Sequence, residues 1–130
     1  MKFLATVILL MLFAGCATSS ETEISNAVSD YIKAAELEER DGIRTMGNWS
    51  HHVISQRYAT LETKKENFLV EFSRRCHELT QNEVTPDIRY DNNILRSRFD
   101  TIRGCRIGRI YAIDKGQAEE LMNLGEAPGN

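Results

Sequence analysis

The feature that most constrains this 130-residue chain is its N-terminus, where an apolar run stops at a glycine and a cysteine. A single positive charge at Lys2 precedes the mostly apolar stretch Phe3–Ala14, and Gly15-Cys16 follows. As a helix, a run of this length would reach about 18 Å, well short of the roughly 30 Å hydrocarbon core of a bilayer. We therefore interpret residues 1–15 as a removable export signal, so that 115 of the 130 residues remain to form one small domain.

The end of this leader indicates a lipid anchor at Cys16. Phe13-Ala14-Gly15-Cys16 resembles the bacterial lipobox, in which an apolar residue and two small ones precede a cysteine that is lipidated and becomes the new N-terminus; Phe13 stands where leucine is usual. Several acyl chains on Cys16 would anchor the protein stably, whereas a single chain binds a membrane only marginally. Residues 16–23 would form a polar tether, and Ala17 favours the outer membrane by resemblance to bacterial lipoprotein sorting. The expected location is the periplasmic face of the outer membrane; the alternative is ordinary signal cleavage and release into the periplasm.

Export would place the two remaining cysteines, Cys76 and Cys105, in an oxidising compartment. An even pair of cysteines in a small exported domain is most simply interpreted as a disulfide. Closing a loop of about 30 residues would stabilise the fold by roughly 3–4 kcal/mol in the chain-entropy model. The alternative is a redox or metal role, but the pair lacks CxxC spacing and no further cysteine is available to complete a zinc site. We therefore expect a disulfide, and neither a metal nor a cofactor.

The segment after the tether has the pattern of a long amphipathic helix. Ser20–Glu23 matches a capping box, and apolar residues then recur at helical spacing from Ile24 to Ala35. We expect this helix to run to about Arg40-Asp41, with Gly42 as its stop.

The middle of the chain predicts a hairpin. Arg57–Thr63 is strand-like, Lys64–Asn67 is polar and turn-like, and Phe68–Phe72 alternates with Phe68, Val70 and Phe72 on one face. Residues 76–93 are expected to be mostly loop. Trp49, the only tryptophan, is interpreted as a core anchor, with ligand stacking as the alternative.

The last third predicts further strand structure and a short helix. In Phe99–Ile113 the apolar residues change parity between Ile107 and Ile110, which a bulge at Gly108 would repair, so one bent strand or two short ones are expected. Asp114 is placed to cap a helix that Gly125 ends, and residues 126–130 should form a loose tail.

These elements together predict an α+β fold. A small antiparallel sheet is packed by a long N-terminal helix and a short C-terminal helix, in a single domain over residues 24–125. The composition, 42% hydrophobic and 27% charged, is that of an ordinary globular protein rather than a disordered, collagen-like or coiled-coil chain.

Several stretches together resemble a known family. They are Phe68–Phe72, Cys76 with Leu79, Phe99–Ile102 and Cys105–Tyr111. The chain is similar over about residues 25–125 to a family of small bacterial lipoproteins from Gram-negative organisms that is classed as a domain of unknown function. The resemblance supports the fold and the disulfide, and it implies no activity and no catalytic residues.

No arrangement of residues identifies a reaction. The chain has no G-x-S-x-G elbow and no P-loop, and adjacent His51-His52 would not converge on one metal ion. An enzyme, such as a hydrolase acting on cell-envelope material, would need unrecognised groups to meet in a deep pocket. The candidates for such a role are Glu71, His77, Asp100 and Tyr111.

Charge distribution is the most informative asymmetry. Residues 84–113 hold six arginines against three aspartates, while residues 17–48 and 114–130 are acidic. Guanidinium groups bind carboxylates and phosphates in two-point fashion, so this stretch could recognise peptidoglycan carboxylates, lipopolysaccharide phosphates or an acidic protein. The residues proposed for this role are Arg98, Arg103, Arg106 and Arg109. The alternative is that these arginines simply pair with acidic residues of the packed helices.

The expected function is therefore a non-enzymatic module, held to a membrane through Cys16, that binds an anionic envelope component or a protein partner. Nucleic acid is not an expected partner, because the chain is expected to leave the cytoplasm. A purely structural role in the envelope is a third possibility.

Overall fold

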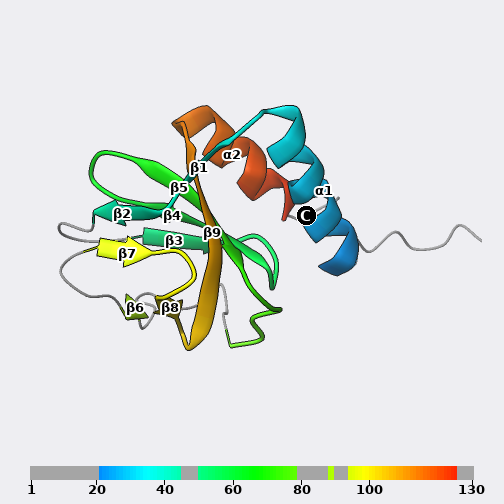
Figure 1. Ribbon diagram of the computed structural model, residues 1–130. Coiled ribbons are helices and arrows are strands. Elements are labelled where there is room, and N and C mark those ends of the chain that lie inside the picture. Colours follow the sequence, from blue (N-terminus) through cyan, green and yellow to red (C-terminus); the bar gives the residue numbers. More distant parts are fainter. Residues whose placement is uncertain (1–20, 45–49, 79–87, 90–93, 126–130) are drawn as a thin grey trace, which may run out of the picture.

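The computed structural model describes residues 21–44, 50–78, 88–89 and 94–125, and it has an α+β architecture (Figure 1). The elements are α1 (Glu21–Ala34), β1 (Glu38–Arg40), β2 (Gly42–Arg44), β3 (Ser50–Val53), β4 (Tyr58–Glu62), β5 (Asn67–Phe72), β6 (Ile88–Arg89), β7 (Ile94–Arg96), β8 (Thr101–Ile102), β9 (Cys105–Ile113) and α2 (Lys115–Leu124). The expected N-terminal helix, antiparallel sheet and C-terminal helix are confirmed.

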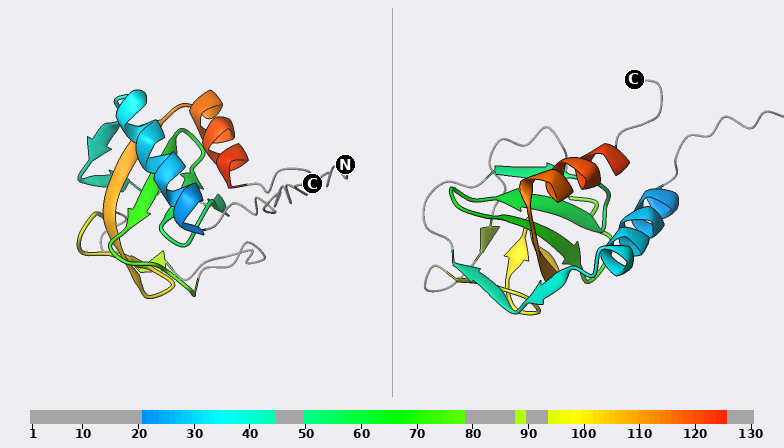
Figure 2. Two further views of the ribbon diagram at one scale, coloured as in Figure 1. Left: turned by 90° about the vertical axis from the view of Figure 1, so that its right-hand side faces the viewer. Right: turned by 90° about the horizontal axis from the view of Figure 1, so that it is seen from above.

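The sheet is organised around its longest strand, β9. The strand order is β3-β4-β5-β9-β8-β6, and β1 also pairs with β9, while β2 and β7 form a separate two-stranded sheet. One edge of β9 pairs with β5, and the other edge pairs first with β8 and then with β1. Both helices lie on one face of the sheet, as the two views of Figure 2 show.

The two faces of the central strands are buried in two different cores. On the face away from the helices lies what we call the sheet core, formed by Ile43, Val53, Ala59, Leu61, Phe68, Val70, Phe72, Cys76, Leu95, Ile102, Cys105, Ile107 and Ile110. On the other face lies the helix core, formed by Val28, Ile54, Tyr58, Leu69, Tyr111, Ile113, Ala118 and Leu121. Because neighbouring residues on a strand point to opposite faces, β5 and β9 supply both cores.

The predicted β4–β5 hairpin is confirmed. Leu61 pairs with Phe68, and the turn between the strands is closed by a hydrogen bond from the Thr63 amide to the Glu66 carbonyl. Phe68, Val70 and Phe72 share the sheet core as the alternation predicted.

The N-terminal helix ends earlier than expected, at Ala34 rather than near Arg40-Asp41. Glu36 adopts a left-handed φ of 50°, its amide binds the Lys33 carbonyl, and the Leu37 amide binds the Ile32 carbonyl. These two bonds are the Schellman pattern, which usually places glycine where Glu36 stands. The chain then continues as β1 instead of reaching the predicted stop at Gly42.

The predicted bulge and the predicted C-terminal helix are both confirmed. β5 pairs Glu71 with Arg109 but Phe72 with Ile107, so Gly108 is the extra residue. Asp114 caps α2 in a reciprocal capping box with Gln117, and Gly125 ends the helix. A Cβ at Gly125 would lie 2.8 Å from the Ile54 carbonyl oxygen, so close packing requires glycine there.

The expected strand from Phe99 to Ile113 is two strands, β8 and β9, and Phe99 itself lies outside them in a turn. The two central residues of the β8–β9 hairpin, Arg103 and Gly104, have positive φ angles of 53° and 78°, as in the turns that match hairpin twist.

The sequence interpretation also missed β1, β2, β3, β6 and β7, which have two to four residues each and carry little alternation. Residues 16–20 of the predicted tether, Trp49 and residues 126–130 lie outside the described residues, whereas residues 21–23 form the first turn of α1 instead of a tether. Neither helix of the described chain is long and apolar enough to cross a bilayer.

We predict that Glu36→Gly stabilises the protein by about 1 kcal/mol, because glycine removes the steric cost of the left-handed conformation at the end of α1. Urea unfolding of the two proteins measures the difference. Asp30→Gly is the matched control, since Asp30 is exposed inside the same helix and glycine there should cost roughly 0.5–1 kcal/mol. A loss of stability in Glu36→Gly would contradict this account of the helix end.

Candidate functional site

Three of the four predicted binding arginines lie on one segment, residues 96–106, which we call the arginine loop. Arg98, Arg103 and Arg106 are all exposed there. Arg98 and Arg106 make no ion pair within the described part of the chain. Their guanidinium groups are therefore available to solvent.

The arginine loop is held by its own backbone and by a buried aspartate. Asp100 is 9% exposed, and its carboxylate accepts a hydrogen bond of 2.5 Å from the Arg96 amide. The Arg98 amide donates to the Ile107 carbonyl at 2.7 Å, and the Ile107 amide donates to the Asp100 carbonyl at 3.0 Å. The loop thus presents its side chains from a fixed frame.

An aromatic ring stands out on this loop. Phe99 is 74% exposed and is the one large apolar side chain exposed to that degree among the described residues. The Arg96 guanidinium lies over the ring, 5.7 Å from its centroid, at cation–π distance. Aromatic residues and arginine are both enriched at protein contact surfaces relative to the rest of the surface.

Arg109, the fourth predicted arginine, belongs to a different cluster. It hydrogen-bonds Tyr111 and is attracted by Glu71 and Glu39, and these contacts raise the pKa of its guanidinium above the ordinary value. For Arg109, the structure therefore favours the alternative in which the arginine interacts with acidic residues of the same chain.

Two of the four groups considered for catalysis come together. The Tyr111 hydroxyl lies 3.4 Å from the Glu71 carboxylate, and Arg57 lies 3.9 Å from the same carboxylate. Burial raises the pKa of Tyr111, so its phenol stays protonated at neutral pH. Burial likewise raises the pKa of nearby Tyr58 to about 12.

The other two groups make different contacts. Asp100 binds the backbone of the arginine loop, and His77 lies beside Glu78.

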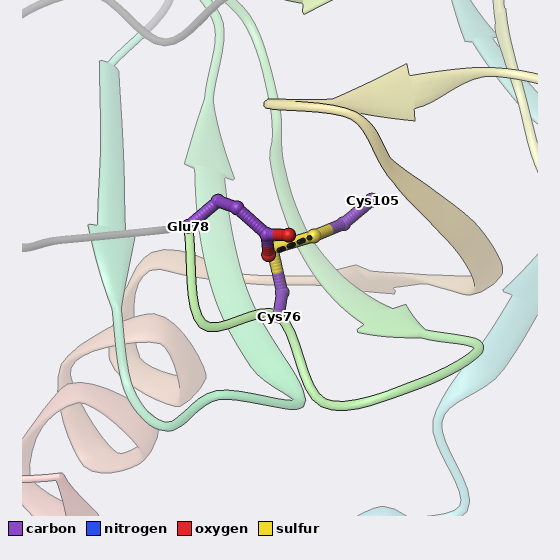
Figure 3. A group of neighbouring side chains, drawn as sticks. All are labelled: Cys76, Glu78 and Cys105. Atoms are coloured by element: carbon purple, nitrogen blue, oxygen red, sulfur yellow. Dashed lines mark hydrogen bonds between the residues drawn. A yellow bond between two sulfur atoms is a disulfide. The ribbon is translucent and has the colours of Figure 1, made fainter.

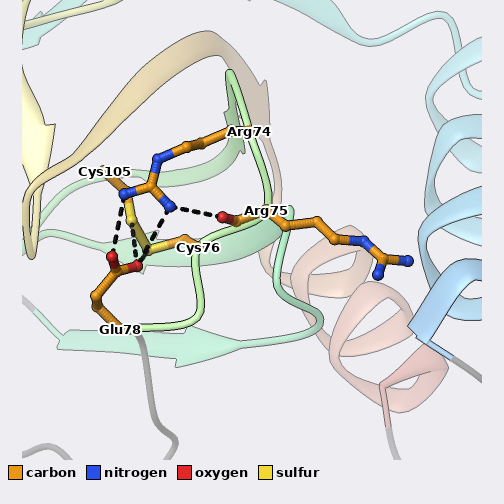
Figure 4. Close-up of polar contacts among 5 residues, drawn as sticks. All are labelled: Arg74, Arg75, Cys76, Glu78 and Cys105. Carbon is orange, nitrogen blue, oxygen red and sulfur yellow. Dashed lines mark hydrogen bonds and ion pairs between the residues drawn. A yellow bond between two sulfur atoms is a disulfide. The ribbon is translucent and has the colours of Figure 1, made fainter.

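Cys76 and Cys105 lie at disulfide distance, with their Sγ atoms 2.01 Å apart, and both are fully buried in the sheet core (Figure 3). A Glu78 carboxylate oxygen lies 3.2 Å from the Cys105 sulfur and 3.6 Å from the Cys76 sulfur. The Arg74 guanidinium holds this carboxylate through contacts of 3.1 and 3.4 Å (Figure 4). Its hydrogen bond lowers the pKa of Glu78, which therefore carries a negative charge beside the disulfide.

The same three side chains are the one group of potential metal ligands found together among the described residues. The donor atoms of Cys76, Glu78 and Cys105 lie within 4.8 Å of one another. Metal ligation by cysteine requires the thiolate, and sulfurs joined in a disulfide do not supply it. His51 and His52 stand next to each other on β3 and so point to opposite faces of the sheet.

A cavity of about 810 Å³ opens at one end of the sheet, between the β1–β2 segment and the β4–β5 turn. Its lining residues are Arg40, Gly42, Ile43, Arg44, Thr63, Lys64, Lys65, Glu66 and Phe68. We call it the basic cavity, because four cationic side chains line it against one carboxylate. Its volume is within the range of small-molecule sites.

A smaller hollow of about 320 Å³ lies on the other side of β2. Arg44 lines both hollows, and Arg96 lines the smaller one. The Ser97 amide and hydroxyl both donate to the Asp41 carbonyl, which ties the arginine loop to the β1–β2 corner. The start of the arginine loop therefore lies beside the β1–β2 corner, whereas Arg103 and Arg106 lie at the end of β9 away from the β4–β5 turn.

The cations of the basic cavity were missed by the sequence interpretation. The sequence patterns predict a helix end near Arg40 and a polar turn at Lys64 and Lys65. The one available signal is that Arg40 and Arg44 lie near the predicted helix end while Lys64 and Lys65 follow the strand-like stretch 57–63, and that signal says nothing about their distance in space.

Comparison with known proteins shows that the chain belongs to a family of unknown function, DUF6491, which matches residues 1–124. No curated protein matches the chain, and no solved structure matches it either. The family therefore identifies the chain without supplying an activity.

We predict that replacing both Cys76 and Cys105 by serine lowers the free energy of unfolding by about 3–4 kcal/mol. The reason is that the disulfide joins residues 29 positions apart, and without it the unfolded chain has a higher conformational entropy. Urea unfolding of the non-reduced proteins measures the loss, and alkylation with intact-mass analysis shows whether thiols are present in the native protein. Free thiols in the native protein, or an unchanged unfolding midpoint, would contradict the proposed covalent link.

Proposed function

We propose that this member of the DUF6491 family is a lipoprotein anchored in the outer membrane through Cys16, which binds an acidic partner protein in the periplasm through the arginine loop. The observation that carries the proposal is the exposed Phe99, stacked with Arg96 on a loop that also presents Arg98, Arg103 and Arg106. The family match begins at residue 1 and so includes the leader and Cys16.

The chemistry of the loop supports a protein as the ligand. Protein interfaces are enriched in aromatic residues and arginine, and their strongest contacts are buried aromatic or arginine side chains surrounded by polar groups. Phe99 offers an apolar anchor, and the surrounding guanidinium groups offer two-point contacts to carboxylates. Because Asp100 already fixes the loop, binding orders little additional backbone.

The arrangement of the molecule favours a partner in the periplasm rather than a component of the membrane leaflet that would hold the anchor. α1 begins on the side of the molecule opposite to β7 and β8 (Figures 1 and 2). Cys16 precedes Glu21, the first residue of α1, by five residues, and five residues reach at most about 18 Å. An anchor at Cys16 would therefore keep the start of α1 near the membrane and leave the arginine loop on the outward side.

A hydrolase acting on envelope material is the second candidate function. The contact between Glu71 and Tyr111 favours it, because a carboxylate and a phenol can serve as general base and acid. Both residues, however, belong to strands on the face that packs against the helices, whereas the basic cavity opens beside Ile43 and Phe68 of the sheet core. We prefer the binding role because the arginines and Phe99 of the arginine loop are exposed and the backbone of that loop is held by hydrogen bonds.

We predict that a photo-crosslinking amino acid in place of Phe99 captures an acidic envelope protein in intact cells, identified by mass spectrometry. Replacing Arg98, Arg103 and Arg106 by glutamine should abolish the crosslink, since the attraction to carboxylates is lost. The paired substitution Lys33→Gln and Lys115→Gln, which removes two exposed cations from the helices, is the control and should leave the crosslink unchanged. Crosslinks only to lipid or peptidoglycan, or crosslinks indifferent to the arginines, would refute the proposed partner.

The anchor has its own test. Cells grown with labelled palmitate should yield a labelled protein in the outer-membrane fraction, and Cys16→Ser should lose the label because the thiol that accepts the diacylglyceryl group is gone. Labelling of Cys16→Ser to the wild-type level would show that the acyl chains are attached elsewhere. An unlabelled wild-type protein released with the periplasmic contents would show that the chain is secreted without an anchor.

A further inference from the structure

We propose that the basic cavity is a binding site for a small polyanion carrying two phosphate groups, either free or as the headgroup of a lipid. This site is separate from the arginine loop, and its proposal does not depend on the identity of a protein partner. Three features of the cavity support this proposal: the charge of its lining, its closed floor and the separate segments that supply its cations.

The lining carries an excess of positive charge from three separate segments. Arg40 belongs to β1, Arg44 ends β2, and Lys64 and Lys65 form the β4–β5 turn. Glu66 is the one carboxylate in the lining, and Glu38 pairs with Arg40 from outside it at 3.5 Å. Like charges gathered around one cavity repel each other, so an anionic occupant would relieve an unfavourable arrangement.

The amount of charge favours phosphate over carboxylate. A phosphate ester carries about 1.5–2 negative charges near neutral pH, whereas a carboxylate carries one. Two phosphates would therefore match the four cations and the one carboxylate of the lining. Arginine binds phosphate by two-point hydrogen bonds and lysine binds it as a compact charge, and the cavity provides two residues of each kind.

Two nearly buried apolar side chains close the floor of the cavity. Ile43 and Phe68 are only 4% and 3% exposed because they pack into the sheet core. The occupant therefore meets mainly the other lining residues, which present aliphatic stems as well as charged ends. If it is a lipid, we expect the headgroup to enter and the acyl chains to stay outside.

The walls are held in place before any ligand arrives. The Thr63 hydroxyl accepts hydrogen bonds from the amides of Lys65 and Glu66, which fixes the turn that carries the lysines. Gly42 lies where a Cβ would come within 3.1 Å of the Leu95 carbonyl oxygen, so β2 and β7 approach closely beside the cavity. A preformed site binds with a smaller entropic cost than one that must be assembled.

The test is calorimetric titration of the full chain, purified in a non-ionic detergent, with sodium pyrophosphate. We expect saturable binding that weakens at least roughly tenfold in Lys64→Gln combined with Lys65→Gln, and that tightens in Glu66→Gln. The paired Lys33→Gln and Lys115→Gln variant has the same change in net charge and should bind like wild type. Unfolding midpoints of all variants show whether the fold is kept.

Two further titrations distinguish the possible sources of the phosphate groups. Citrate, which offers only carboxylates, should bind more weakly than pyrophosphate. Mixed micelles with a lipid diphosphate, which presents two phosphates at the end of a hydrocarbon chain, should bind more tightly than pyrophosphate if the natural occupant is a lipid headgroup, and no more tightly if it is a free phosphate compound. The proposal is overturned if neither phosphate probe binds, if citrate binds as well as pyrophosphate, or if the lysine pair on the helices matters as much as Lys64 and Lys65.

Discussion

The burial of β5 and β9 on both faces is the constraint on which the rest of the structure depends. Leu69, Val70 and Phe72 of β5 and Ile107 and Ile110 of β9 are fully buried, and burying a side chain of this kind typically contributes about 1.5–3 kcal/mol. A sheet with only one apolar face could leave its other face in water. Here the helices must cover one face and the β2–β7 sheet with the disulfide segment must cover the other, which leaves only loops and edges for binding.

The disulfide segment connects these layers. The Cys76 amide donates to the Gln56 carbonyl, while the Gln56 amide donates to the Glu21 carboxylate at the start of α1. Arg75 reaches Thr22 in the same turn of α1, so the helix is attached to the chain that carries the disulfide. The Glu78 carboxylate, held by Arg74, places a negative charge beside the two sulfurs, which disfavours attack by an anionic thiolate.

Features governed by neighbouring residues were predictable from the sequence. The β4–β5 hairpin, the Gly108 bulge and the Asp114 cap follow from alternation, a parity change and a capping box, all of which act over a few residues. The end of α1 was not predictable in this way, because Glu36 adopts a conformation that glycine usually adopts, and tertiary contacts of Leu37 with the helix core compensate for its cost. The short strands were missed because pairing partners, and not their own composition, make them strands.

The candidate sites also divide into features that the sequence could predict and features that depend on the fold. Arg98, Arg103 and Arg106 cluster in the sequence and remain together on one loop, so their grouping could be predicted. Arg109 follows a bulge, and the resulting change of direction brings it to Glu71 and Tyr111. The basic cavity arises only because β1 and β5 pair with opposite edges of β9, which brings Arg40 and the β4–β5 turn to the same end of the sheet. No local pattern contains that information.

The net charge of −3 does not oppose recognition of anions by such a chain. At physiological ionic strength, exposed charges are screened over about 8 Å, so an approaching anion responds to the nearest side chains rather than to the total. The acidic residues of α1 and α2 lie on the helix side, while Arg44 and Arg96 line hollows at the other end. An anion is therefore attracted at these hollows and repelled at the helices. Charge separation of this kind orients binding, and the proposed anchor beside α1 would keep the repelling helix side near the membrane.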